Sequence, residues 1–215
     1  NTASNQQTSH LYLNDSSYQV TLRITDAVGC KAQIKKQVII YQQPQSDFYN
    51  YLSCSNNPTS FFSSADAFGN TISSYLWKFD TIGDTSTFAN SNYLFAQQGN
   101  YPVKLIVYTN NGCVDSITKS IIVKPSPVAD FTISPVCLER YTLFTDVSLM
   151  PSPWYYLNRE WDLGDGSLSN ASLVNHIYSD TSIYQVKLKI TASSGCKSEI
   201  TKPVKASQNP VADFS

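Results

Sequence analysis

The chain has 215 residues, room for one or two domains, and a formal net charge of -1 with only 14% charged residues. This balance offers no basic face to nucleic acid, and no apolar run approaches the ~18 residues that a membrane-spanning helix needs. Aromatic residues reach 13%, and these side chains, together with β-branched ones, fit half-buried strands, so the composition favours an all-β protein.

An internal repeat organises the chain. The dipeptide Gly-Cys occurs at Gly29-Cys30, Gly112-Cys113 and Gly195-Cys196, in two equal steps. The same step relates Tyr18, Tyr101 and Tyr184; Leu22, Leu105 and Leu188; Asp47, Asp130 and Asp213; and Phe48, Phe131 and Phe214. The period predicts four segments: the C-terminal half of a repeat in residues 1–43, complete repeats in residues 44–126 and 127–209, and the first strand of a further repeat in residues 210–215.

Residues 1–43, the first of these segments, match the part of a repeat that follows its Trp-containing strand. A half-sandwich leaves the inner face of one sheet bare and its strand edges unpaired, which is costly. We therefore expect that this segment does not fold alone as a globular domain. Upstream chain or a neighbouring molecule would complete it.

Each complete repeat is predicted to consist of short strands joined by turns. Residues 184–190 alternate apolar and polar side chains, as in a strand with one buried face, residues 192–195 form a turn, and a strand resumes over residues 200–204. Several such strands in about 80 residues predict a sandwich. The linkers at residues 40–44 and 123–127 contain proline and no glycine, which favours a stiff rod of serial sandwiches.

Three motifs in the third repeat carry a family resemblance. They are Val128-Ala129-Asp130-Phe131, Trp161-Asp162-Leu163-Gly164-Asp165-Gly166 and His176-Ile177-Tyr178. Together they resemble the PKD (polycystic kidney disease) domain, whose hallmark is a Trp-Asp-Phe-Gly-Asp-Gly run; the second repeat departs from it by an insertion within residues 77–84. The resemblance implies an all-β fold of tandem immunoglobulin-like sandwiches joined end to end. The Gly-Cys turn is similar to that of PKD repeats in large Bacteroidota surface proteins, including gliding-motility adhesins.

The cysteine count is odd, which in a secreted protein needs a reason. Cys54 and Cys113 have the same spacing along the chain as Cys137 and Cys196. This shared spacing predicts one disulfide inside each complete repeat, and it leaves Cys30 unpaired because its partner would lie upstream of the chain. Five reduced, buried thiols are the alternative. Metal binding is disfavoured because Cys-x-x-Cys spacing is absent.

Other side chains are candidates for ligand binding or modification. Trp154, Tyr155 and Tyr156 precede the Trp161 strand, where aromatic rings could stack on sugars, pack on the neighbouring domain or cap the core. Thr81 and Ser116 each follow Asp and precede Ile, so they resemble the Asp-Ser/Thr-aliphatic sites of Bacteroidota O-glycosylation. An ordinary strand or turn hydroxyl is the alternative for both residues.

Acidic turns raise the question of calcium. Asp80, Asp84, Asp162 and Asp165 are clustered carboxylates of the kind that hard cations prefer, but tight turns also use Asp side chains to bind nearby backbone amides. The spaced ligand series of an EF-hand loop is absent, so we expect turns and no metal or other cofactor. No serine-hydrolase, zinc-protease or phosphate-loop motif occurs, so no enzymatic activity is expected.

These observations favour non-catalytic spacer repeats of a giant extracellular adhesin or filament at the cell surface. The resemblance to gliding adhesins implies export by the type IX pathway. The expected partners are neighbouring repeats, with cell-surface glycans or other surface proteins as further candidates, and neither nucleic acid nor membrane insertion is expected. The alternatives are accessory PKD modules of a secreted polysaccharide- or protein-degrading enzyme, or a carbohydrate-binding module.

Overall fold

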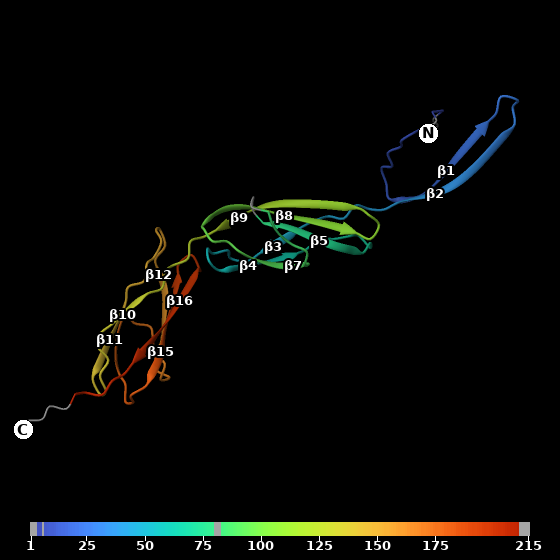
Figure 1. Cartoon of the computed structure of the whole chain (residues 1–215). Helices are drawn as coiled ribbons and strands as arrows, with labels where there is room; N and C mark the ends of the chain where they lie inside the picture. The colour runs from blue at the N-terminus through green and yellow to red at the C-terminus, as the bar shows by residue number, and fades with distance from the viewer. Residues whose placement is uncertain (1–3, 6, 80–82, 211–215) are drawn as a thin grey trace, which may run out of the picture. The chain divides into compact units, whose positions relative to one another are not determined.

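The computed structural model describes residues 4–5, 7–79 and 83–210, and within them it contains sixteen β-strands and no helix (Figure 1). The predicted all-β class of tandem immunoglobulin-like sandwiches is therefore confirmed. The chain divides into two compact units, one comprising Asn1–Tyr49, Phe62–Ser91 and Pro102–Lys119, the other Asn50–Phe61, Asn92–Tyr101 and Ser120–Ser215.

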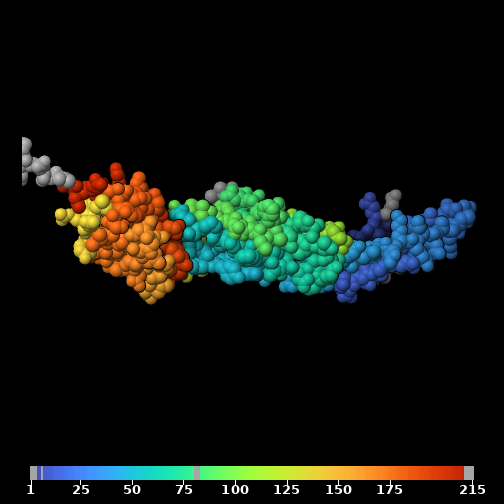
Figure 2. Space-filling model, turned by 90° about the horizontal axis from the view of Figure 1, so that it is seen from below, coloured from blue at the N-terminus to red at the C-terminus, as the bar shows by residue number. Residues whose placement is uncertain are grey.

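The first unit begins with a long antiparallel hairpin, blue in Figure 1 and Figure 2. Strands β1 (Ser16–Thr25) and β2 (Lys31–Ile40) pair from Ser16↔Ile40 to Thr25↔Lys31 and form a sheet of their own. Val20, Leu22 and Ile24 alternate along β1, yet they are 43%, 61% and 60% exposed. The strand pattern is therefore present without the second sheet that would bury its apolar face.

The second repeat supplies seven strands in two antiparallel sheets. The three-stranded sheet has the order β3 (Phe48–Asn50), β4 (Pro58–Ser63), β7 (Asn90–Leu94), and the four-stranded sheet has the order β6 (Asp84–Ser86), β5 (Ile72–Phe79), β8 (Gly99–Thr109), β9 (Val114–Val123). In the first unit, the ring of Phe48 packs edge-on against Trp77 with centroids 5.1 Å apart. Trp77 and Leu105 face each other on neighbouring strands and are fully buried, so the alternating positions of β5 and β8 point inward.

The third repeat lies wholly in the second unit and repeats this strand order. Its sheets are β10 (Phe131–Ile133), β11 (Tyr141–Asp146), β14 (Leu173–Ile177), and β13 (Leu168–Ser169), β12 (Tyr156–Asp162), β15 (Ile183–Ala192), β16 (Lys197–Lys205). Phe131 of the first sheet meets Trp161 of the second with centroids 5.1 Å apart, which shows that the two inner faces pack together. The core also contains Phe144, Leu188 and Ile190, each fully buried. Leu188 corresponds to the exposed Leu22 of the hairpin.

The turn that follows Trp161 is fixed by close packing on a neighbouring strand. Gly164 has a φ of +84°, and a Cβ added there would lie 2.9 Å from the backbone nitrogen of Gln185 in β15. The hydroxyl of Tyr178 donates a 2.9 Å hydrogen bond to the carbonyl of Leu163. The turn in the hallmark run therefore requires glycine at position 164, because the β15 backbone occupies the space that a side chain would need.

Candidate functional site

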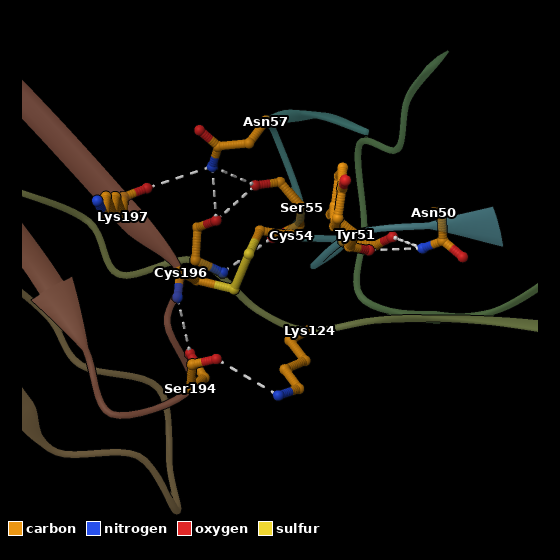
Figure 3. Close-up of a disulfide and its surroundings, with 11 residues drawn as sticks. Asn50, Tyr51, Cys54, Ser55, Asn57, Lys124, Ser194, Cys196 and Lys197 are labelled. Atoms are coloured by element: carbon orange, nitrogen blue, oxygen red, sulfur yellow. Dashed lines mark hydrogen bonds between the residues drawn. A yellow bond between two sulfur atoms is a disulfide. The ribbon is translucent and has the colours of Figure 1, made fainter. Parts of the chain in front are cut away.

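One disulfide joins the two complete repeats inside the second unit. Cys54 and Cys196 are bonded with an S–S distance of 2.05 Å and a Cα–Cα distance of 5.7 Å, across a sequence separation of 142 residues (Figure 3). Cys54 is 6% exposed and Cys196 is fully buried. The bond therefore lies in a closed contact between the loop before β4 and the turn between β15 and β16.

The predicted pairing of Cys54 with Cys113 and of Cys137 with Cys196 is wrong, because the structure pairs Cys54 with Cys196. Cys30, Cys113 and Cys137 carry free thiols, as predicted for Cys30 alone. Cys54 and Cys196 are both disulfide cysteines, as predicted, but each is bonded to the other.

The third repeat shows why a bond within one repeat cannot form. Cys137 forms an isolated parallel bridge with Ser207, just beyond the end of β16, whereas Cys196 precedes the start of β16. The nine residues of β16 span roughly 30 Å, and a disulfide needs Cα atoms about 4.4–6.8 Å apart. The two cysteines of a repeat thus lie at opposite ends of its last strand and are too far apart to bond to each other.

The turn that carries Cys196 is built by glycine and backbone hydrogen bonds. Gly195 has a φ of +90°, its amide donates to the carbonyl of Ala192 at 2.8 Å, and the Ala192 amide donates to the Cys196 carbonyl at 2.9 Å. A positive φ at this position is readily adopted by glycine alone. The Gly-Cys dipeptide is therefore a turn signal that also places a thiol at the end of the hairpin.

Asn57 adds a polar connection beside the disulfide. Its Nδ2 lies within hydrogen-bond distance of the carbonyl oxygens of Lys197 and Ser55, each at 3.2 Å (Figure 3). It also lies 2.9 Å from Ser126 Oγ, so its two hydrogens are shared among three acceptors. The Ser126 hydroxyl in turn donates to the Ser55 carbonyl at 2.6 Å. One amide thus links the loop before β4, the linker after β9 and the first residue of β16.

Lys124 occupies the other side of the disulfide. Its ammonium donates to the carbonyl of Ser194 at 3.3 Å and lies 5.4 Å from the centre of the Trp154 ring, a cation–π contact. A Cβ on Gly195 would lie 2.8 Å from Leu52 Cδ2, so the turn approaches the loop closely. Sequence reasoning missed these contacts because each joins residues of two different repeats.

The three neighbouring aromatic residues do not form one stacking platform. Trp154 is half-buried against Lys124, and Tyr156 packs against the core while its hydroxyl donates to the carbonyl of Ser148. Tyr155 is 67% exposed. Packing on the neighbouring repeat, one of the interpretations considered for Trp154, is the contact that the structure contains.

Of the two candidate glycosylation residues, Ser116 lies in the described part of the chain. Ser116 is an exposed residue of β9, and the preceding Asp115 accepts a hydrogen bond from the Ser46 amide at 2.6 Å. That hydrogen bond lowers the pKa of Asp115 below its usual range. Thr81 lies outside the described residues.

The acidic side chains of the hallmark turn bind backbone amides. Asp162 Oδ1 accepts from the amide of Gly164 at 3.0 Å, and Asp165 Oδ1 accepts from the amide of Ser167 at 3.0 Å. Asp165 Oδ2 also lies 2.6 Å from His176 Nε2. Burial would raise the pKa of Asp165, but these hydrogen bonds outweigh it and the pKa is lowered.

A Lys–Asp pair recurs at the start of each complete repeat. Lys119 Nζ lies 2.6 Å from Asp47 Oδ1, and Lys202 Nζ lies 2.6 Å from Asp130 Oδ1. These hydrogen bonds from lysine lower the pKa of both carboxyl groups. The period that relates the two aspartates also relates Lys119 to Lys202, so the internal repeat could have predicted this ion pair.

Neither a metal-binding cluster nor a membrane-spanning helix occurs in the part of the chain that the structure describes. Residues 4–5, 7–79 and 83–210 contain no group of three or more His, Cys, Asp or Glu side chains placed to hold a metal ion. Within the same ranges, no helix is long and apolar enough to cross a membrane.

The repeated sheet order defines a tandem immunoglobulin-like β-sandwich protein. The family model of the PKD domain matches residues 42–125 and 124–207, and the chain therefore belongs to the PKD domain family, whose members are generally non-catalytic modules. A search of curated proteins returned no match.

Solved structures with similar folds include further PKD domains. The PKD1 domain of the Vibrio cholerae metalloprotease PrtV is 26% identical over 39% of this chain and 99% of that chain, with a TM-score of 0.36. The PKD1 domain of Vibrio anguillarum Epp is 22% identical over 40% of this chain and 99% of that chain, with a TM-score of 0.37. A carbohydrate-binding module of the β-sandwich superfamily is 16% identical over 75% of this chain and 84% of that chain, with a TM-score of 0.37.

Proposed function

We propose that the chain is a non-catalytic spacer of an extracellular protein, in which consecutive PKD repeats are fastened to each other covalently. The observation that carries this proposal is the Cys54–Cys196 disulfide. Such bonds persist in oxidising compartments outside the cell and are rare in the cytosol. A bond between repeats, not within one, suits a protein that must transmit force along its length.

The position of the bond determines the path of an applied force. When the chain is pulled by its two ends, tension passes from Cys54 through the sulfur atoms to Cys196 and bypasses the stretch between them, which covers a sequence separation of 142. That stretch would extend by about 500 Å if it unravelled under load. The disulfide therefore keeps most of both repeats, and the linker between them, outside the force path.

Single-molecule pulling of the full chain by its termini tests this function. The oxidised chain should show no step that corresponds to a whole repeat, whereas the reduced chain and Cys54→Ala should release about 500 Å in total. Cys113→Ala is the matched control and should behave as the unmodified chain. Equal extensions for the oxidised and reduced chains would reject the proposal.

We further assign this spacer to the stalk of a cell-surface adhesin of the gliding type, exported by the type IX pathway. The Gly-Cys turns and the exposed Ser116 after Asp115 support this assignment. Protease treatment of intact source cells should then remove the repeats, and the native protein should exceed the mass of the bare chain by a glycan on Ser116. Protection from the protease would exclude the surface location.

A further inference from the structure

The loop that carries the free Cys137 has the same backbone conformation and hydrogen bonds as the loop that carries the bonded Cys54. Each cysteine forms an isolated parallel bridge, Cys54 with Lys124 and Cys137 with Ser207. The next amide donates to the carbonyl of that bridge partner, at 2.8 Å from Ser55 and at 3.0 Å from Leu138. The following residue is left-handed in both loops, with φ 57° at Asn56 and at Glu139. Cys137 is therefore held as Cys54 is held, at the equivalent end of its repeat.

A side-chain hydrogen bond also recurs beside this loop. Asn209 Nδ2 donates to the carbonyl of Leu138 at 3.0 Å, where Ser126 Oγ donates to the carbonyl of Ser55 at 2.6 Å. Arg140 occupies in the third repeat the sequence position that Asn57 occupies in the second. Its guanidinium can donate to a carbonyl as the Asn57 amide does.

The turns that carry Cys30 and Cys113 match the turn that carries the bonded Cys196. The amide four residues before each cysteine donates to its carbonyl, at 3.0 Å for Cys30, 2.9 Å for Cys113 and 2.9 Å for Cys196. The preceding glycine has φ of +91°, +82° and +90° in the same order. A Cβ on Gly29 or Gly112 would meet nothing within 4 Å, so these two turns lack the close neighbour that Gly195 has.

The observed bond fixes the direction of pairing. In it, the Gly-Cys turn of the third repeat pairs with the loop cysteine of the repeat before it, and the loop cysteine of the second repeat pairs with the turn of the repeat after it. By this rule Cys113 requires a loop cysteine in a preceding repeat, but residues 1–43 contain only Cys30, itself a turn cysteine. Cys137 requires a Gly-Cys turn beyond residue 209, and residues 210–215 contain no cysteine.

We propose that Cys137 acts as Cys54 does and that Cys113 acts as Cys196 does. Each would dock a further PKD repeat and form the same kind of disulfide between repeats. Cys137 takes the Gly-Cys turn of a following repeat, and Cys113 takes the loop cysteine of a preceding one. This inference rests on the covalently fastened spacer proposed above and extends it from one joint to a series.

The bond-forming step needs an oxidant of the disulfide class. The two thiols lose two protons and two electrons as the S–S bond forms, and the oxidant, such as oxidised glutathione or a thiol–disulfide oxidoreductase, is reduced to two thiols. Docking comes first, because the turn must bring its sulfur to the loop cysteine before exchange can complete. No other co-reactant is required.

The test extends the chain from residue 209 with a second copy of residues 127–209, which provides a following repeat with its own Gly-Cys turn. After folding with oxidised glutathione, non-reducing peptide mapping should find Cys54 bonded to Cys196, and Cys137 bonded to the Gly-Cys cysteine of the added repeat. Cys137→Ala should leave that added cysteine free and should raise the count of reactive thiols by one. An extension with residues 44–126 offers the same turn in a different sequence and guards against failure of one added copy to fold.

The outcomes separate this inference from the proposed function. If Cys54–Cys196 forms and Cys137 remains free in both extended chains, the series of joints is wrong and the single joint stands. If Cys54–Cys196 is itself missing from the map, the proposed function fails as well. Bonding of Cys137 to Cys113 or Cys30 of the same chain would also overturn the inference.

Discussion

Replacement of Cys54 by alanine in the oxidised chain should destabilise both complete repeats. Closing a loop of 142 residues restricts the unfolded chain by about 5 kcal/mol at 25 °C in the chain-entropy treatment. When one repeat unfolds while the other remains folded, the loop is only roughly 70 residues and the effect is about 4 kcal/mol. Because measured values usually fall below this limit, we expect the free energy of unfolding to decrease by about 2–4 kcal/mol.

Urea unfolding with and without reductant measures this effect, and Cys113→Ala is the decisive control. Cys113 carries a free thiol, so its replacement should change the free energy of unfolding by less than about 0.5 kcal/mol. If a bond closed each repeat internally, Cys113→Ala and Cys54→Ala would be equally destabilising. Equal losses would therefore refute the pairing between repeats. Reductant should abolish the difference between the unmodified chain and Cys54→Ala.

Three further predictions use pairs or groups that the fold places in contrasting surroundings. Gly164→Ala should destabilise the third repeat well beyond Gly166→Ala, because both glycines have positive φ but only Gly164 faces the β15 backbone at 2.9 Å; thermal unfolding of the two variants tests this. Leu105→Ala should cost about 2–5 kcal/mol in urea unfolding, since Leu105 is fully buried, whereas Leu22→Ala at the equivalent but 61% exposed position should cost under about 0.5 kcal/mol. Asp115 accepts a backbone amide that lowers its pKa, so its contribution to stability is present above the unfolded-state pKa near ~3.9 and is lost as the pH falls through the lower folded-state pKa. Asp115→Asn should flatten the acid side of the stability profile, and an unchanged profile would contradict this.

The strands were predictable because their signal is local. Alternation along residues 184–190 fixes which side chains point inward, and Val186, Leu188 and Ile190 are indeed fully buried. The internal repeat likewise predicted two copies of one sheet order. Both signals depend on the chain's own periodicity, which any correct fold of these residues must satisfy.

The disulfide was not predictable from the same periodicity. The predicted pairing within a repeat and the observed pairing across 142 residues differ by one period, so both align the cysteines equally well. The choice depends on which end of the sandwich each cysteine occupies, and that follows from the length of the last strand and its bridge to the loop. The contacts of Asn57 and Lys124 were hidden for the same reason, since their partners belong to the next repeat.

The loop length has a mechanical consequence that a bond within one repeat could not provide. A bond between the two cysteines of one repeat would shield part of one sandwich and leave every linker in the force path. A loop of 142 residues is longer than one repeat, and it therefore contains the linker at residues 123–127. If the same joint recurs at Cys137, the next loop begins before the first one ends at Cys196. Successive loops then overlap, and reduction of one bond leaves the residues from Cys137 to Cys196 enclosed by the neighbouring loop.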